Sequence, residues 1–317
     1  MTAQSLPRVM ADGPLAPIVL ELTAGQVDWV PWSAAATPAD RDVVGVYTYG
    51  HPRVDGPLLD RFPQLRVVSN YGVGVDHIDV PAAIARKVPV GNTPGILDGA
   101  TADMGFALLL AVARRVVEGD RYARSAEFTR YDPGYMLGSE VHGATLGIIG
   151  MGRIGAQVAQ RGRGFDMRVL YHNRSRRPEI EAKLGAEYAA LDALLAESDY
   201  VMLCCPMTEE TRSLINRTTL AKMKQTAVLI NIARGGVVDT QDLYEALAAK
   251  QIAAAGLDVT EPEPLPREHP LLKLDNVTIV PHLGSATRQT RRRMAELSVE
   301  NLLLGLNGRP LKHEVRS

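Results

Sequence analysis

The chain of 317 residues lacks several features that mark large classes of protein. It has only two cysteines, Cys204 and Cys205, and neighbouring cysteines in an apolar run favour neither a structural disulfide nor a metal site. We therefore expect a reducing, cytoplasmic environment. It also has no excess of charge, because 35 Lys and Arg residues balance 36 Asp and Glu residues. This balance argues against a nucleic-acid partner, and any anion site must be local.

Long apolar runs are missing too. The longest, near residues 104–113, is too short to span a bilayer, and the start of the chain has no basic segment followed by an apolar one. We expect no membrane segment and no signal peptide, and we interpret residues 1–16 as a loose tail. The histidines show no spacing such as HExxH, and no GxSxG motif occurs, so neither a metal site nor a serine hydrolase is expected.

The second half of the chain has short apolar runs that alternate with helical patterns or loops. Buried parallel strands have this composition because helices cover both faces of their sheet. Gly185 is expected to end a helix over 178–184, and Thr240 to cap the helix that follows it. The pattern predicts a doubly wound α/β domain. Its expected strands are 145–150, 167–172, 200–205, 227–232, 253–259 and 277–281.

The first hundred residues repeat this plan more compactly. A long helical pattern, 284–308, places Met294, Leu297, Asn301 and Leu304 on one side, and we expect it to pack on the first unit. An apolar helix over 103–117 would be the outgoing crossover. The strands expected in the first unit are 17–22, 42–49, 65–74 and 88–92. The predicted fold is α/β with two Rossmann-like, doubly wound parallel-sheet domains, and the smaller one is discontinuous. We expect it to comprise 1–103 and 288–317, with a dinucleotide-binding domain over 104–287.

A glycine fingerprint follows the first strand of the larger domain. It reads Gly150-Met151-Gly152-Arg153-Ile154-Gly155 and opens a helix. Such glycines permit a tight turn, close approach of the backbone to a pyrophosphate, and packing of the helix on the strand. A glycine-rich turn without a ligand is the simpler alternative. The strand before the motif, the helix after it and a second strand about 20 residues on favour dinucleotide binding.

The second strand ends in a basic turn that contains Asn173, Arg174 and Ser175. Enzymes that use NAD place a carboxylate here, for the ribose 2′-hydroxyl. A carboxylate would repel a 2′-phosphate, whereas a guanidinium and a hydroxyl can bind one. We therefore expect NADP(H) as the preferred cofactor, with NAD(H) possible. The alternative is a solvated basic turn with no ligand.

Three charged residues follow later strands of the same domain, namely Arg234, Glu263 and His282. Together they suit the reduction of a 2-oxo acid, because an arginine can hold the carboxylate and a protonated imidazole can donate to the carbonyl oxygen. A carboxylate would keep the imidazole oriented. Taken singly, Arg234 could equally be a surface charge, Glu263 one more acid of a proline-rich loop, and His282 a histidine bonded to backbone. Their common position after strands favours catalysis.

At these residues the chain resembles the D-isomer-specific 2-hydroxyacid dehydrogenases, over nearly its whole length. The second half is especially similar to glyoxylate/hydroxypyruvate reductases. The segments that carry the resemblance are NYGVGVDHIDV (70–80), LGIIGMGRIG (146–155), LINIARGGVVDTQDLYEAL (229–247), AAGLDVTEPEPLP (254–266) and NVTIVPHLGSAT (276–287).

The resemblance implies a role for each matching residue. Arg234, Glu263 and His282 would be the substrate-binding arginine, the orienting acid and the proton-transferring histidine. Backbone N–H groups at Val73 and Gly74 would bind the substrate carboxylate, together with Arg234 and His282. The active site would be a cleft between the domains, and family members are typically homodimers joined through the cofactor domains. The implied cofactor contacts are Thr101, Gly150, Gly152, Arg153, Ile154, Gly155, Asn173, Arg174, Ser175, Pro206, Thr211, Ile232, Asp258, His282 and Gly284.

The chain departs from the family pattern in two places, and three alternative functions remain open. Many relatives have a tryptophan-containing loop where this chain has Tyr131, Tyr135 and Met136, which leaves the substrate size open. The region over 23–42 is hard to align with the family. The alternatives are a 3-phosphoglycerate dehydrogenase, a formate or phosphite dehydrogenase, and a corepressor-like protein gated by NAD(P). We favour them less, because no added regulatory domain or long disordered extension is evident, and formate enzymes have glutamine where Glu263 stands.

Overall fold

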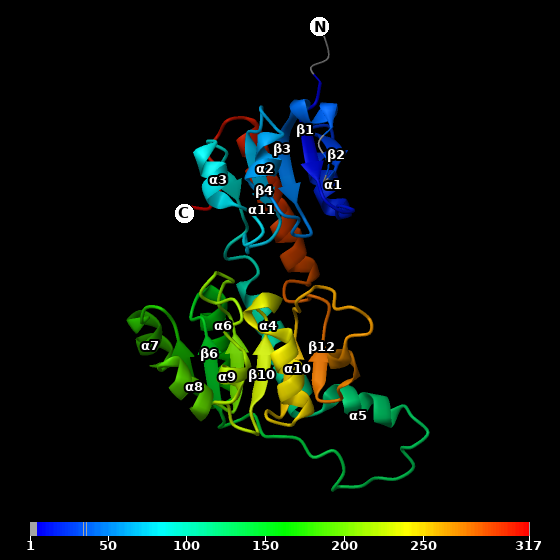
Figure 1. Ribbon diagram of the computed structural model, residues 1–317, viewed down its shortest axis with the longest axis vertical. Coiled ribbons are helices and arrows are strands. Elements are labelled where there is room, and N and C mark those ends of the chain that lie inside the picture. Colours follow the sequence, from blue (N-terminus) through cyan, green and yellow to red (C-terminus); the bar gives the residue numbers. More distant parts are fainter. Residues whose placement is uncertain (1–4, 34, 36, 317) are drawn as a thin grey trace. The chain divides into compact units, whose positions relative to one another are not determined.

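The computed structural model describes residues 5–316 except 34 and 36. The chain forms two compact units, which Figure 1 draws as ribbons. The first unit comprises the chain up to Leu97 together with the part from Thr287 onward, and the second comprises Asp98–Ala286. Each unit contains one parallel sheet with helices against it, so the predicted fold class, including the discontinuous smaller unit, is confirmed.

The sheet of the first unit has five strands among the described residues, in the order β2-β1-β3-β4-β5, and all neighbours are parallel. Such an order reverses direction between β1 and β3, as in other doubly wound sheets. The strands are β1 (Arg8–Ala11), β2 (Asp28–Pro31), β3 (Val43–Thr48), β4 (Val67–Asn70) and β5 (Val90–Gly91). The helices are α1 (Pro17–Thr23), η1 (Pro38–Asp42), α2 (Gly56–Asp60), α3 (Val80–Ala85) and α11 (Arg288–Leu306).

Helix α11 brings the end of the chain back onto this sheet (Figure 1). Alternate residues of β3 and β4 face it, as the two-residue period of a strand requires. The hydroxyl groups of Tyr47 and Ser298 are 2.7 Å apart, and the Ser69 hydroxyl donates to the carbonyl of Ser298 at 2.7 Å. A Cβ on Gly45 would lie 3.2 Å from the side chain of Leu306, so glycine allows the helix to approach closely.

Several predictions for the first unit were wrong. Residues 17–22 form most of α1 and not a strand, because Pro17 opens a helix on which Val19 and Thr23 are buried one turn apart. Part of the expected tail is the interior strand β1, whereas residues 1–4 lie outside the described part. Strand β2 was not predicted. The strand expected over 65–74 ends at Asn70, and the rest is a loop.

The second unit contains seven described strands in the order β12-β11-β10-β9-β6-β7-β8, again with parallel neighbours. Its switch point lies between β6 and β9, where ligands of doubly wound sheets bind. The strands are β6 (Thr145–Ile149), β7 (Arg168–His172), β8 (Glu187–Tyr188), β9 (Tyr200–Leu203), β10 (Val228–Asn231), β11 (Ala254–Leu257) and β12 (Val277–Ile279). The helices are α4 (Asp98–Ala113), α5 (Val116–Ala123), α6 (Arg153–Gly164), α7 (Pro178–Leu184), α8 (Leu191–Glu197), α9 (Arg217–Leu220), η2 (Gly235–Val237), α10 (Thr240–Ala248) and η3 (Pro270–Lys273).

All six strands predicted here are present, and Gly185 ends α7 in a left-handed conformation, as expected. Three details differ. The helix expected over 103–117 runs from Asp98 to Ala113 and stops because Arg115 adopts a left-handed conformation with φ 53°. Asp239, not Thr240, caps α10, and its carboxylate accepts from the N–H of Asp242 at 3.0 Å. The two-residue strand β8 was not predicted.

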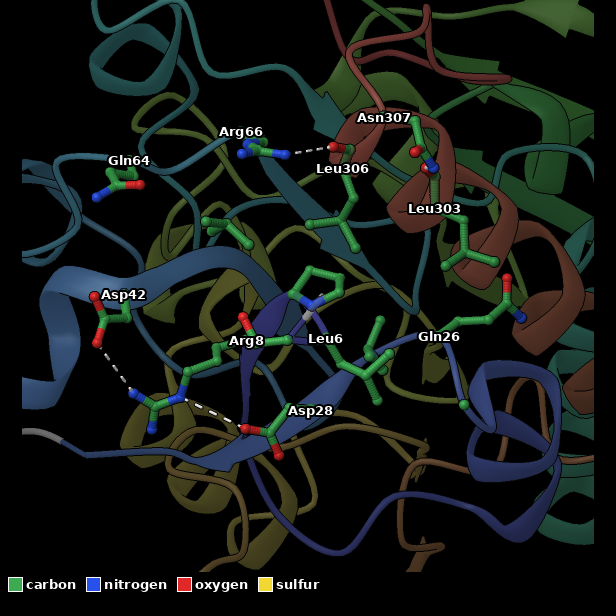
Figure 2. Close-up of a pocket in the computed structure, with 15 residues that line it drawn as sticks. Leu6, Arg8, Gln26, Asp28, Asp42, Gln64, Arg66, Leu303, Leu306 and Asn307 are labelled. Atoms are coloured by element: carbon green, nitrogen blue, oxygen red, sulfur yellow. Dashed lines mark hydrogen bonds and ion pairs between the residues drawn. The ribbon is translucent and has the colours of Figure 1, made fainter. Parts of the chain in front are cut away.

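A cavity of about 1050 Å³ lies in the first unit (Figure 2). It adjoins the starts of β1 and β2, whereas parallel sheets bind ligands at the carboxyl ends of their strands. Its arginines already have partners, since Arg8 lies 3.6 Å from Asp28 and Arg66 donates to the carbonyl of Leu306 at 3.0 Å. None of the predicted site residues lines it.

Over the part of the chain that the structure describes, we find no helix long and apolar enough to cross a membrane. The same residues contain no cluster of three or more His, Cys, Asp or Glu side chains placed to hold a metal ion. Cys204 and Cys205 are free thiols that directly follow β9, and burial raises the pKa of Cys205 to about 11. A thiol with so high a pKa is a poor nucleophile at neutral pH.

Candidate active site

The glycine fingerprint forms the turn between β6 and α6 at the switch point of the second sheet. Gly150 has φ 101°, and a Cβ there would lie 2.4 Å from the backbone nitrogen of Cys205. A Cβ on Gly155 would lie 2.2 Å from the carbonyl oxygen of Gly150. By contrast, a Cβ on Gly152 would meet no atom within 4 Å. Gly150 and Gly155 are therefore needed for packing. Gly152, the N-cap of α6, leaves open space where a pyrophosphate could approach the helix N-terminus.

The basic turn after β7 contains arginines of two kinds. Arg176 pairs with Glu181 at 2.6 Å, and Arg177 pairs with Glu179 at 2.6 Å. Arg174 is exposed and makes no hydrogen bond or ion pair with any residue that the structure describes. The turn therefore offers one guanidinium to a ligand.

Asn173 and the loop after β9 lie next to this arginine. The side chain of Asn173 accepts from the N–H of Met151 at 3.1 Å and so ties the basic turn to the glycine turn. The pKa of Glu210 is lowered mainly by the hydrogen bond from the Thr208 hydroxyl and partly by the charge of Arg174. The Thr211 hydroxyl donates to the carbonyl of Pro206 at 2.7 Å. The loop after β9, which carries the predicted cofactor contacts Pro206 and Thr211, is thus close enough to the basic turn for the charge of Arg174 to act on Glu210.

Asn231 organises the loop that carries Arg234. It is the last residue of β10 and only 1% exposed. Its amide donates to the carbonyl of Arg234 at 2.9 Å and accepts from the N–H of Ala233 at 3.0 Å. The next residue must be glycine, because a Cβ on Gly235 would lie 2.0 Å from the carbonyl oxygen of Thr260. The Arg234 loop therefore lies directly against the start of the loop that carries Glu263.

His282 and Glu263 form a hydrogen-bonded pair. Nδ1 of His282 and Oε1 of Glu263 are 2.7 Å apart, and both side chains are partly exposed. His282 has φ 54°, a left-handed conformation that costs energy in a non-glycine residue. Such strain persists only where the surroundings hold the backbone in place. The pair has the geometry of an acid–base group and its orienting carboxylate.

Asp258 accounts for much of the bonding that keeps the backbone of His282 in this conformation. It follows β11, is 2% exposed, and accepts from the N–H groups of Leu283 at 2.6 Å and Gly284 at 2.9 Å. The N–H of His282 donates to the carbonyl of Asp258 at 2.9 Å. Burial raises the pKa of Asp258, and the hydrogen bonds from these N–H groups oppose the rise. Thr101 is also close, since a Cβ on Gly284 would lie 3.3 Å from its methyl carbon.

In the first unit, the loop after β4 contains Val73 and Gly74. The amide of Asn70 donates to the carbonyls of Gly72 at 2.9 Å and Gly74 at 2.8 Å. The amide of Asn92 donates to the carbonyl of Val73 at 2.8 Å. The N–H groups of Val73 and Gly74 have no hydrogen-bond partner among the described residues. Consecutive N–H groups without a partner are suited to binding an anion.

Sequence reasoning did not assign roles to the residues that shape these loops. Asn70 and Asn231 are each the last residue of an apolar strand, and each is buried. A polar residue at the end of a buried strand must find hydrogen-bond partners, which is a signal that could have singled out both. Asn92 carries no such signal, since it lies beyond the two-residue strand β5 and is only partly buried.

A dinucleotide fold with an acid–base pair at the carboxyl ends of its strands defines a nicotinamide-dependent oxidoreductase. The family model described as D-isomer specific 2-hydroxyacid dehydrogenase, NAD binding domain, matches residues 106–284, more than half of the chain. The chain belongs to this family.

Three relatives illustrate the match. The chain is 53% identical over 251 residues to a glyoxylate reductase of Korarchaeum cryptofilum, covering 79% of this chain and 76% of the relative. It is 46% identical over 314 residues to one of Aeropyrum pernix, covering 96% and 94%. Its structure is similar to that of an NADPH-dependent glyoxylate/hydroxypyruvate reductase from Sinorhizobium meliloti in complex with NADP and malonate. The TM-score is 0.89 and the sequence identity is 34%, and the match covers 98% of this chain and 97% of the other.

Proposed function

We propose that this enzyme reduces small 2-oxo acids of the glyoxylate/hydroxypyruvate type to D-2-hydroxy acids, with NADPH as the preferred cofactor. The observation that carries the proposal is the 2.7 Å contact between Nδ1 of His282 and Oε1 of Glu263. The loop that carries Glu263 also packs against the loop that carries Arg234. These loops follow β10, β11 and β12 of the dinucleotide fold. The curated relatives named glyoxylate reductases support the substrate class.

The side chains divide the work of binding and proton transfer. When bound, the nicotinamide supplies the hydride. Arg234 holds the substrate carboxylate with its planar guanidinium, and the N–H groups of Val73 and Gly74 bind the same group. His282 donates a proton from Nε2 to the carbonyl oxygen, and Glu263 keeps the ring oriented through Nδ1.

The proposed cofactor preference comes from the turn after β7. No carboxylate stands where NAD enzymes place one, and Arg174 and Ser175 are exposed beside the glycine turn. These two groups would bind the 2′-phosphate of NADPH. NADH has no such phosphate, so it would lack these two contacts and keep the rest. The other residues proposed to hold the cofactor are Thr101, Gly150, Gly152, Arg153, Ile154, Gly155, Asn173, Pro206, Thr211, Ile232, Asp258, His282 and Gly284.

We assign the second unit to the cofactor and the first to the substrate, and we propose a homodimer. The segment after α5 supports the dimer, since it exposes large apolar side chains. Tyr131 is 83% exposed, Leu137 72% and Tyr135 50%. Several large, exposed apolar groups on one segment are typical of protein interfaces.

The test is turnover of NADPH with a panel of glyoxylate, hydroxypyruvate and bulkier aromatic or branched 2-oxo acids. We expect the small acids to be reduced fastest. In the His282→Gln variant we expect kcat to fall by about 10³-fold while the Kd for NADPH rises by a much smaller factor, because His282 is only one of many residues proposed to hold the cofactor. Full activity of that variant would refute the proton-donor role. A protein that binds NADPH but oxidises it with none of the acids would instead be a nucleotide-gated binding protein.

A further inference from the structure

Beyond Tyr71, whose N–H donates to the carbonyl of Thr48 at 2.9 Å, the loop proposed to bind the substrate carboxylate is held through its carbonyl groups. From Tyr71 to Gly74, every carbonyl accepts a hydrogen bond from a side chain or backbone group behind it, and the donors come from Asn70, Asn92 and Thr93. The bonds are Thr93 Oγ1 to Tyr71 O at 3.0 Å, Thr93 N to Gly72 O at 3.2 Å, Asn70 Nδ2 to Gly72 O at 2.9 Å and to Gly74 O at 2.8 Å, and Asn92 Nδ2 to Val73 O at 2.8 Å.

Fixing a carbonyl also fixes the N–H group of the following residue. The peptide bond is planar and trans, so its C=O and N–H groups point in opposite directions. Asn70 therefore sets the direction of the N–H of Val73 through the carbonyl of Gly72. Asn92 likewise sets the direction of the N–H of Gly74 through the carbonyl of Val73. These are the two N–H groups proposed to meet the carboxylate.

The two asparagines are supported differently. Asn70 is buried, and its Oδ1 accepts from the Thr48 hydroxyl at 2.8 Å within the sheet. Asn92 lies just beyond β5, and its backbone is held by the last part of the chain. Its carbonyl accepts from Nδ2 of Asn301 at 3.0 Å, and its N–H donates to the carbonyl of His313 at 3.3 Å.

Asn301 and the C-terminal segment complete a closed set of bonds around Asn92. The N–H of His313 donates to Oδ1 of Asn301 at 3.1 Å, and the N–H of Val315 donates to the carbonyl of Val90 at 2.8 Å. A Cβ on Gly91 would lie 2.9 Å from Cβ of Asn301, so the strand and α11 are in direct contact. The position of Asn92 is thus set from both sides.

We propose that Asn92 is a positioning residue for the substrate carboxylate, and that Asn301 of α11 and the segment around His313 act on the carboxylate-binding loop through it. The proposal rests on the proposed function, in that Val73 and Gly74 must bind the carboxylate. It predicts in addition that substrate affinity depends on Asn92 and Asn301, which do not touch the substrate.

The experiment compares Asn92→Ala with Asn307→Ala. Asn307 is a matched control, because its amide also donates to a carbonyl of the same unit, that of Leu303 at 2.7 Å, but only at the exposed end of α11. For Asn92→Ala we expect the KM for glyoxylate to rise about tenfold, with kcat within about twofold of the wild type and an unchanged affinity for NADPH. Asn307→Ala should leave all three unchanged. Asn301→Ala should raise the KM by a smaller factor.

A measurement without turnover guards against a variant that is merely less stable. Malonate should slow the exchange of amide hydrogens over residues 72–75 in the wild type, and at the same concentration it should slow it much less in Asn92→Ala. If the wild type reduces glyoxylate and Asn92→Ala has the same KM and the same protection, the positioning role is refuted alone. If the wild type neither reduces any 2-oxo acid nor shows protection by malonate, the proposed function fails and this inference fails with it.

Discussion

The loop after β4 in the first unit and the loop after β12 in the second unit are held by hydrogen bonds of opposite polarity. In the first unit, Asn70 and Asn92 donate to carbonyl groups of the loop after β4, and the N–H groups of Val73 and Gly74 have no partner among the described residues. In the second unit, Asp258 accepts from the N–H groups of Leu283 and Gly284, and the loop after β12 offers the side chain of His282. A loop held through its carbonyl groups can therefore offer N–H groups to a ligand, whereas a loop held through its N–H groups offers a side chain.

Because the loops of the second unit offer side chains, we expect its function to depend on the chemical identity of those side chains. The substitution Arg234→Lys keeps the charge but loses the planar fork that matches a carboxylate. We expect the KM for glyoxylate to rise by about 10²-fold, with a smaller loss of kcat. Steady-state kinetics with varied glyoxylate would measure it. An unchanged KM would show that Arg234 does not hold the substrate.

The bonds to backbone N–H groups in the second unit can be weakened without removing a catalytic group. In Asp258→Asn one acceptor oxygen becomes an NH₂ group, so either Leu283 or Gly284 loses its acceptor. We expect kcat to fall about tenfold because the backbone of His282 is less well held. Asp258→Ala should lower it further. A kcat equal to that of the wild type in both variants would contradict the role given to Asp258.

The cofactor turn tests whether one exposed side chain selects between two nucleotides. For Arg174→Ala we expect the Kd for NADPH to rise by about tenfold and that for NADH to stay within about twofold. Fluorescence titration with each nucleotide would measure both. The matched substitution Arg177→Ala removes an arginine that already pairs with Glu179, and it should change the NADPH affinity less. Equal effects of Arg174→Ala on both nucleotides would remove the 2′-phosphate assignment.

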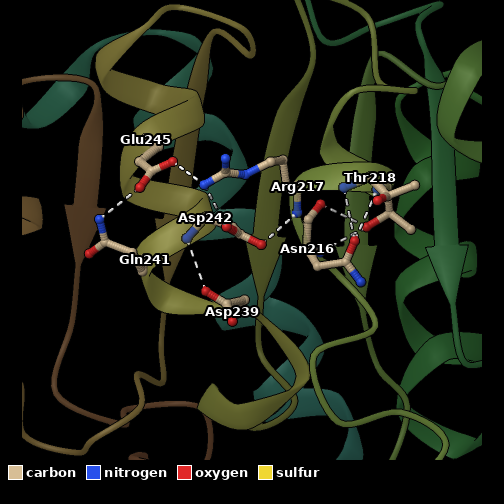
Figure 3. A network of polar contacts seen from close by, with 8 residues as sticks. Asn216, Arg217, Thr218, Asp239, Gln241, Asp242 and Glu245 are labelled. Atoms are coloured by element: carbon tan, nitrogen blue, oxygen red, sulfur yellow. Dashed lines mark hydrogen bonds and ion pairs between the residues drawn. The ribbon is translucent and has the colours of Figure 1, made fainter.

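The smallest effect is expected where polar contacts lie on the surface and away from the strand ends. Arg217 at the start of α9 pairs with Asp242 and Glu245 of α10, next to the cap residue Asn216 (Figure 3). Because its side chain is 70% exposed, Arg217→Ala should lower the free energy of unfolding by about 0.5 kcal/mol. Denaturant unfolding would measure this, and kcat and KM should stay at wild-type values. A change in either would mean that this network reaches the active site.

The second unit was predicted well because its strands are buried on both faces and are therefore uniformly apolar. The first unit shows the limit of the same rule. The run PIVLEL has the composition of a buried strand, yet it forms α1, and a run of six residues does not distinguish the two. Strand β1 has only four residues and stands in what looks like a tail.

The site shows a similar division. The sequence singles out Arg234, Glu263 and His282 as candidates because each follows an apolar strand within a few residues, and their catalytic roles stay a prediction. The bond from Asn92 to Val73 joins residues 19 apart, and the bonds from Asp258 reach 25 and 26 residues along the chain. Such contacts depend on how loops pack after the sheet has formed. No local pattern of residues contains them.

We propose that Arg234 and His282 bind the substrate acid and that Arg174 binds the 2′-phosphate of the cofactor. A crystal structure of the enzyme with NADP and malonate tests it most directly. We expect a malonate carboxylate within hydrogen-bond distance of the Arg234 guanidinium and of Nε2 of His282, with the 2′-phosphate on Arg174. Malonate bound away from Arg234 and His282, or a 2′-phosphate without contact to Arg174, would contradict the account.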